Sequence, residues 1–304
     1  MTNPPEPAEE FAAARRMPAI IAMSPPRSAM VRSLRRHPTM WLGAALLGAV
    51  VLTAILAPLI ATTDPAALNP AQRVKPPSSE AYFGTDMLGR DIFSRSVYGA
   101  RVSLIVGLGV AVLASSVGRV IGLVAGFTRW ADGVIMRIMD GMMSIPAILL
   151  AIALMTLLRG GSVFNVILAI TLAEIPRVAR LTRSAVLSVR ELAYVEAAVA
   201  CGTSKFGIIR QHILPNTIAP ITVQATYICA SAMITEAILS FIGAGLPTSI
   251  PSWGNIMAEG RALWQVKPNI VFFPAVFLSI TVLAVNLLGD GLRDSIDPRL
   301  AKRV

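Results

Sequence analysis

The sequence has 304 residues, of which 55% are hydrophobic and only 14% are charged, and its mean hydropathy is +0.67. Soluble globular proteins carry about 25% charged residues, so this chain has too few charges to cover a water-facing surface. The same composition excludes an intrinsically disordered chain, which needs low hydrophobicity and many charges. The net charge of +10 would favour a nucleic-acid partner only if the basic residues formed one patch. We therefore expect an all-α, polytopic membrane protein.

Metal, disulfide and nucleotide chemistry find little support in the sequence. The only cysteines are Cys201 and Cys229, and the only histidines are His37 and His212. A structural zinc site needs four clustered ligands, which these residues cannot supply. No GxxxxGK[ST] phosphate-binding loop occurs. We expect a chain that binds no metal or cofactor of its own and does not hydrolyse ATP.

Six apolar stretches suit the hydrocarbon core of a bilayer, which takes roughly 20 residues per helix. They lie at about residues 41–60, 104–127, 134–158, 163–178, 218–242 and 270–288. The first is longer than the apolar part of a signal peptide and is interpreted as an uncleaved anchor. We expect six transmembrane helices.

These stretches divide the chain into five regions. They are a cytoplasmic tail (1–39), a first transmembrane helix (40–61), an extracytoplasmic segment (62–103), a core of five transmembrane helices (104–292) and a cytoplasmic C-terminal tail (293–304). The core contains a large cytoplasmic loop at 184–216. In the extracytoplasmic segment, charged and apolar residues alternate from Thr85 onwards, which predicts a helix lying at the membrane interface before the second span.

The distribution of positive charge predicts the orientation. With the N-terminus inside, 18 of the 27 Lys and Arg residues fall in inner segments and eight in outer ones, while Arg119 lies within the second span. Cytoplasmic loops carry the excess of Lys and Arg in membrane proteins. Both termini are therefore expected in the cytoplasm, and we expect the Arg119 side chain to extend to the inner surface.

The basic stretch between the fourth and fifth spans is the most informative part of the chain. Residues 194–200 predict a short helix with small side chains on one side, which would let another surface approach closely. Gly202 suits a sharp turn after this helix, and Pro215 is expected to end the following helix before the chain re-enters the membrane. The residues alone fit two interpretations: a docking surface for another protein, or a basic loop held to anionic lipid.

This stretch resembles the EAA motif of ABC-importer permeases. The matching residues are Glu196-Ala197-Ala198, then Gly202, then Leu214-Pro215. In that family the segment forms the coupling helices that dock into a groove on the ATPase subunit. The chain departs from the general pattern at His212, where the family has Ile. The run His212-Ile213-Leu214-Pro215-Asn216 is typical of the peptide and nickel branch.

Three further regions resemble the C-type permease of dipeptide and oligopeptide importers. The first, before the second span, contains Phe83-Gly84-Thr85-Asp86, Leu88-Gly89-Arg90-Asp91 and Ser94-Arg95. The second contains Leu239-Ser240-Phe241-Ile242-Gly243 and Pro251-Ser252-Trp253-Gly254, and the third runs from Asn286 to Asp294 with Asp297-Pro298-Arg299 after it. Together the four matches occur in order and cover the chain from about residue 83 to its end.

The resemblance implies an ABC type I importer permease fold in the bacterial inner membrane. It implies a heterodimer with a second permease, two cytoplasmic subunits that hydrolyse ATP, and an extracytoplasmic solute-binding protein. The residues implied in coupling to the ATPases are Glu196, Ala197, Ala198, Gly202, Leu214 and Pro215. The implied solute is a di- or oligopeptide, while nickel chelates, glutathione or another small solute stay open because the binding protein does much of the selecting.

Polar residues within the spans are candidates for the translocation path. Ionisable groups in a bilayer cost several kcal/mol, about 3 or more, unless they face a cavity or a partner. Glu236, Gln224 and Asn286 could line such a path, or could instead form hydrogen bonds between helices. Glu174 fits a position at the level of the lipid head groups better than one on the path.

Two other classes of protein stay open as alternatives. An intramembrane enzyme would need two acids, or a nucleophile and a base, at the same depth, and Glu174 and Glu236 are the only candidates. A membrane scaffold without a transport role is the other, and the importer-like loop argues against it.

Small residues form rows in the second span. Gly118, Gly122 and Gly126 make a GxxxGxxxG pattern, which lets helices pack closely in lipid. We expect this row to pack within the subunit rather than against the second permease.

Overall fold

The protein is a bundle of long helices, seen here in a computed structural model that describes residues 38–158 and 161–296. In chain order they are α3 (Pro38–Ile55), α4 (Ala57–Ile60), α5 (Ile92–Phe127), α6 (Arg129–Met143), α7 (Ala147–Leu157), α8 (Val163–Arg190), α9 (Ala193–Ala200), α10 (Lys205–Ile208), α11 (Leu214–Phe241), α12 (Trp253–Gly260) and α13 (Asn269–Ile296). Short turns of other helix types lie at Pro70–Gln72, Ile209–Ile213 and Arg261–Leu263. The all-α prediction is confirmed for this part of the chain. Most of the two predicted tails, residues 1–37 and 297–304, lies outside the described residues.

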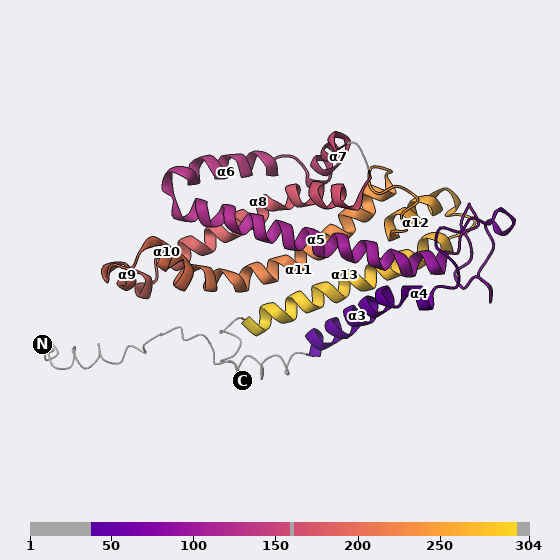
Figure 1. The fold of residues 1–304 in the computed structure, drawn as a ribbon, viewed down its shortest axis with the longest axis horizontal. Coiled ribbons are helices and arrows are strands. Elements are labelled where there is room, and N and C mark those ends of the chain that lie inside the picture. The colour runs from indigo at the N-terminus through magenta and orange to yellow at the C-terminus, as the bar shows by residue number, and fades with distance from the viewer. Residues whose placement is uncertain (1–37, 159–160, 297–304) are drawn as a thin grey trace, which may run out of the picture.

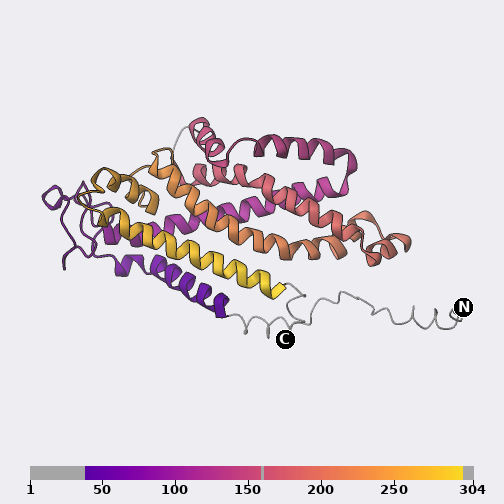
Figure 2. The same cartoon turned by 180° about the vertical axis from the view of Figure 1, so that it is seen from behind.

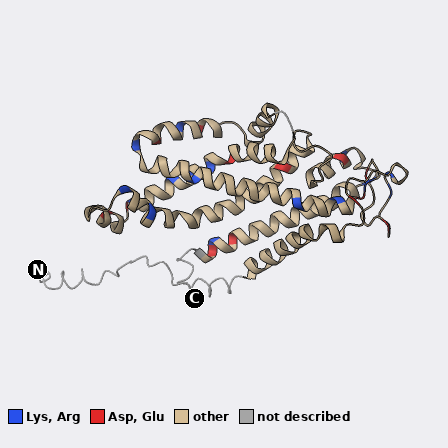
Figure 3. Cartoon of the chain, in the orientation of Figure 1, with Lys and Arg blue, Asp and Glu red and all other residues tan. Residues whose placement is uncertain are grey.

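The long helices lie side by side in an elongated bundle (Figures 1 and 2). The short helices α9 and α10 project at one end, while α12 and the connection before α5 lie at the other. Most of the charged residues lie towards these two ends (Figure 3). The two ends are therefore the water-facing ones, as expected for a bundle that crosses a bilayer.

Four helical stretches within the described residues are long and apolar enough to cross a membrane: Pro38–Ile55, Ile92–Phe127, Lys205–Phe241 and Asn269–Ser295. The pair α6 and α7 would make a fifth, but the two helices meet at 92°. The span expected over 134–158 is therefore broken into two helices. Pro146 lacks an N–H group and disfavours a helical Ile145, which breaks the helix between Met143 and Ala147.

Helix α5 is one continuous helix of 36 residues. The helix expected before residue 104 forms the first turns of α5, which begins at Ile92, but these turns are buried within the protein rather than laid on the membrane interface. Asp91 caps it, since its side chain accepts a hydrogen bond from the Ser94 N–H at 2.8 Å. The stretch between Arg101 and Arg119 has no charge and is about 27 Å long, close to the thickness of a bilayer core.

Helix α8 extends well past the expected end of the fourth span at residue 178, up to Arg190. It is held against α5 by the small-residue row. A Cβ atom on Gly118 would lie 2.6 Å from the Val178 Cβ, and one on Gly126 would lie 2.8 Å from the Val186 Cβ. Such backbone approach is possible only for glycine. The row therefore packs within the subunit, as predicted.

Helix α11 starts without a break from the preceding turn. Pro215 was expected to end a helix, and this prediction is wrong: Pro215 lies in the first turn of α11. The π-helical turn Ile209–Ile213 lies directly before α11, where the missing N–H of Pro215 interrupts the helical hydrogen bonds. Lys205–Phe241 nevertheless forms one helical path from the end near α9 into the bundle.

Candidate coupling surface

The helix expected over residues 194–200 is present as α9, and it ends in a Schellman motif. The Thr203 N–H donates to the Ala198 carbonyl and the Gly202 N–H to the Val199 carbonyl, both at 3.0 Å. Gly202 adopts a φ of +79°, which confirms the predicted sharp turn. A Cβ there would meet open space, so the backbone angle and not crowding requires glycine.

Val195 is the one fully buried side chain of α9 and anchors the helix in an apolar cluster. Val195 is 3% exposed and packs in a small apolar cluster with Val186 of α8, Ile208 of α10 and Ile213 of the π-helical turn. The other residues of α9 are exposed, apart from a half-buried Ala198. Glu196 and Ala197 are therefore exposed, and the small-residue surface is open to another protein.

The start of α11 is tied to α9 through residues that the sequence did not mark as a pair. The Asn216 Nδ2 donates to the Tyr194 Oη at 3.2 Å and to the His212 carbonyl at 2.5 Å. The His212 ring lies 5.7 Å from the Tyr194 ring. His212, the departure from the general EAA pattern, is thus part of this contact. Spacing along the chain gave no signal for it, because Tyr194 and Asn216 are 22 residues apart.

The six predicted coupling residues fall into two groups. Glu196, Ala197, Ala198 and Gly202 lie on α9 and its terminal turn, and Leu214 and Pro215 lie at the base of α11. Between α9 and the turn that joins α5 to α6 is a cavity of about 1010 Å³, lined by Glu196 together with Arg129, Trp130 and Lys205. The cavity and the exposed face of α9 form one surface at this end of the bundle.

Polar contacts connect this surface to the helices of the bundle. The Arg190 guanidinium, at the end of α8, donates to the Gly126 carbonyl of α5 at 2.8 Å. Arg183 of α8 binds Asp132 of α6 through two bonds of 2.5 and 2.7 Å. Both contacts fix the C-terminal end of α8, which leads directly into α9.

The three residues considered for a translocation path do not meet in one place. Glu236 is fully buried, and its Oε1 accepts a hydrogen bond from Ser240 one turn further along α11 at 2.8 Å. Gln224 lies 12 residues earlier on the same helix, about 18 Å away along its axis, and Asn286 is on α13. Both are half-buried. Glu174, on α8, pairs with Arg177 at 2.8 Å.

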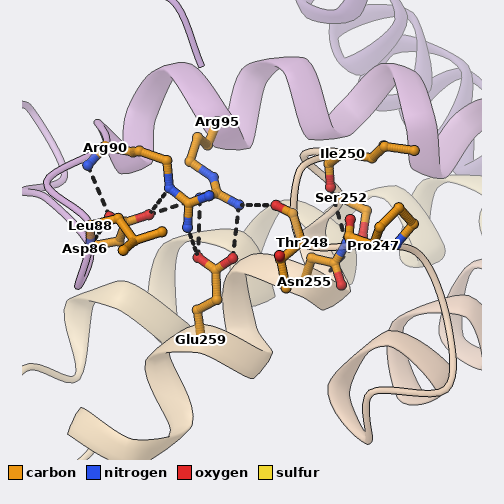
Figure 4. Close-up of polar contacts among 10 residues, drawn as sticks. All are labelled: Asp86, Leu88, Arg90, Arg95, Pro247, Thr248, Ile250, Ser252, Asn255 and Glu259. Carbon is orange, nitrogen blue, oxygen red and sulfur yellow. Dashed lines mark hydrogen bonds and ion pairs between the residues drawn. The ribbon is translucent and has the colours of Figure 1, made fainter. Parts of the chain in front are cut away.

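At the opposite end, a buried ion cluster joins the segment before α5 to α12 (Figure 4). Asp86 accepts from Arg90 at 2.6 Å and from Arg95 at 2.8 Å, and both Asp86 and Arg95 have side chains only 1% exposed. Glu259 of α12 completes the cluster with Arg90 at 2.5 Å and Arg95 at 3.1 Å. Burial raises the pKa of Glu259, while Arg95 and Arg90 oppose the rise, so its charge depends on both arginines.

Sequence reasoning placed these charges on a membrane interface and missed Glu259. The pairing joins residues more than 160 positions apart, which no local pattern reveals. Within the described residues no group of three or more Cys, His, Asp or Glu side chains is arranged to hold a metal. Cys201 is exposed and Cys229 is buried.

Comparison with known proteins identifies the family of this chain. Residues 118–302 match the model described as "Binding-protein-dependent transport system inner membrane component", and residues 26–77 match the "N-terminal TM domain of oligopeptide transport permease C". Among curated proteins, the chain is 52% identical to the probable peptide ABC transporter permease protein y4tQ of Sinorhizobium fredii, over 90% of this chain and 94% of that protein. It is 42% identical to the dipeptide transport system permease protein DppC of Alkalihalophilus pseudofirmus, over 92% of this chain and 91% of that protein.

The fold has a counterpart among solved structures. The MetNI methionine ABC transporter, in inward-facing conformations, matches with a TM-score of 0.59 and 20% identity, over 68% of this chain and 98% of that one. At this identity the likeness concerns the fold alone. The family match covers more than half of the sequence and includes α8, α9 and α11. The chain belongs to the binding-protein-dependent transport system inner membrane components, as an ABC-importer permease with an N-terminal domain of the oligopeptide-permease-C type.

Proposed function

We propose that this chain, together with a second permease subunit, forms the path by which a di- or oligopeptide crosses the bacterial inner membrane. As a permease it is a transport subunit and not an enzyme, and ATP is hydrolysed by two partner subunits in the cytoplasm. A solute-binding protein delivers the peptide on the other side. The names of the two curated relatives, which both refer to peptide transport, support this solute. Glutathione and nickel chelates are the alternative solutes. Uptake measured with each of these compounds and with peptides distinguishes between them.

The coupling to ATP hydrolysis runs through α9. The observation that carries this assignment is that Val195 is buried while Glu196 and Ala197 are exposed, so α9 is anchored on one side and exposes its small residues on the other. A force applied to α9 reaches α8 through the Val195–Val186 packing and α5 through the Arg190–Gly126 hydrogen bond. Leu214 and Pro215 pass the same movement to α11.

The orientation follows from this assignment. The α9 end faces the cytoplasm, with both termini on that side, and the Asp86–Glu259 cluster faces outwards. Six elements cross the membrane: α3, α5, the bent pair α6 and α7, α8, α11 and α13. The apolar half of α8, residues 163–173, carries no charge and packs beside α5, which lets α8 cross although its second half is basic.

The test is a charge reversal on α9 in the complete transporter reconstituted in proteoliposomes. Glu196→Lys is expected to reduce both peptide uptake and the ATPase activity stimulated by the binding protein. Glu80→Lys makes the same change on an exposed residue at the outer end and serves as the matched control. Wild-type uptake and ATPase activity in Glu196→Lys would contradict the coupling role. Activity of the purified chain without its ATPase partners would favour the intramembrane enzyme instead.

A further inference from the structure

A groove of about 470 Å³ lies between α3, α5, α11 and α13, away from α9 and from the outer ion cluster. Its volume is in the range of sites that hold small molecules. Most of the lining is aliphatic, and the lining residues used below are Leu108, Val112, Ser115, Arg119 and Thr226. Arg119 is the only ionisable side chain of the lining apart from the Cys229 thiol.

The wall of the groove along α5 is about as long as one membrane leaflet is thick. Leu108, Val112, Ser115 and Arg119 follow one another along one side of α5, since their spacings are four, three and four residues. The distance from Leu108 to Arg119 along the helix is about 16 Å, close to half of a hydrocarbon core of ~30 Å. Arg119 ends the uncharged stretch of α5 on the side of α9, so it lies at the inner head-group level.

Two hydrogen-bond donors at this end have no partner in the described part of the chain. The Ser115 Oγ is buried and makes no hydrogen bond there. Arg119, one turn further on the same face, is half-buried and forms no ion pair with residues 38–158 or 161–296, and the groove lining contains no carboxylate. The Thr226 hydroxyl, by contrast, already donates to the Val223 carbonyl at 2.7 Å.

We propose that the groove binds an anionic phospholipid of the inner leaflet, with the phosphate on Arg119 and one acyl chain along Val112 and Leu108. A guanidinium matches phosphate oxygens, and basic pockets between helices on the cytoplasmic side suit anionic head groups. Leu108 and Val112 are 56% and 61% exposed, so an acyl chain can enter from the side. A peptide carboxylate would match Arg119, but its polar backbone would find few partners along the aliphatic walls.

The test uses the complete transporter, delipidated in detergent, and phosphatidylglycerol that carries a photoreactive group in its acyl chain. Cross-linked peptides are identified by mass spectrometry, and binding is titrated against phosphatidylcholine with the same chains. Cross-links are expected within residues 104–119, and Arg119→Gln should weaken phosphatidylglycerol binding by about 10-fold, the loss expected for a charge-assisted hydrogen bond. Arg137→Gln, an exposed arginine on α6 outside the groove, is the matched control and should bind as wild type does.

A second variant keeps the proposal testable if Arg119→Gln proves unstable. Val112→Trp on the exposed rim is expected to reduce cross-linking without removing a charge. Equal binding of the two lipids, unchanged binding in Arg119→Gln, or displacement by excess peptide would each overturn the proposal. So would a disulfide cross-link between Val112→Cys and the second permease, because the groove would then be covered by protein.

Discussion

Gly122 of α5 lies so close to Thr182 of α8 that a Cβ atom on Gly122 would come within 2.5 Å of the Thr182 Cβ. The Ala179 carbonyl would lie at the same distance, so backbone as well as side chain closes the space. The two helices are therefore in contact over the turns that lead to α9. This contact makes α5 and α8 one rigid unit behind the coupling surface.

Gly122→Ala is expected to force α5 and α8 apart and to lower the free energy of unfolding by about 1–3 kcal/mol, as for other overpacked contacts. Gly141→Ala on α6 is the control, because a Cβ there meets nothing within 4 Å. Thermal unfolding of the detergent-solubilised transporter measures both. A Tm for Gly122→Ala no lower than that of Gly141→Ala would show that the helices can separate without cost.

Gly202 allows a graded test of the turn after α9. With φ at +79° and open space around it, the cost of a side chain is set by the backbone angle. Gly202→Ala should destabilise the turn after α9 by about 1–2 kcal/mol. Gly202→Asn should destabilise it less, because asparagine tolerates left-handed backbone angles. ATPase activity stimulated by the binding protein should fall in the order wild type, Asn, Ala, Val. An order that follows side-chain size alone, with Asn worse than Ala, would point to steric blockage of docking instead.

Glu259 is the residue whose loss should most weaken the outer end. Glu259→Gln leaves Arg90 and Arg95 buried with one carboxylate fewer. Breaking a buried ion pair in this way lowers the free energy of unfolding by about 3–5 kcal/mol. Glu80→Gln, on an exposed residue of the same region, is the control. Hydrogen exchange of residues 83–95 and 253–260 reports the local effect. Equal exchange in the two variants would contradict a structural role for the cluster.

Local patterns in the sequence predicted some of the local features correctly. The short helix before Gly202 and the positive φ of Gly202 follow from composition and from glycine's freedom, and both are present. The bend at Pro146 and the start of α11 at Pro215 were missed, because a proline in a sequence marks either the end or the first turn of a helix. The residues around these two prolines do not distinguish the two cases.

Long-range contacts could not be predicted in the same way. The basic residues of α8 indicated a loop. Arg183 instead forms an ion pair with Asp132 of α6, and α8 continues as a helix to Arg190. Arg95 and Glu259 meet only in the folded chain, and so do Tyr194 and Asn216. Hydrophobic periodicity carries no information on such pairs.

The most direct test of the coupling role is a disulfide cross-link between α9 and an ATPase subunit. The exposed Cys201 is first replaced by serine, while the buried Cys229 stays in place. Ala197→Cys, on the exposed face of α9, is then combined with single cysteines on the ATPase in transport-competent vesicles, and Ala66→Cys at the outer end serves as the control. We predict a cross-link to the ATPase from residue 197 that blocks peptide uptake until it is reduced, and none from residue 66. Active transport without any cross-link from residue 197 would contradict the account.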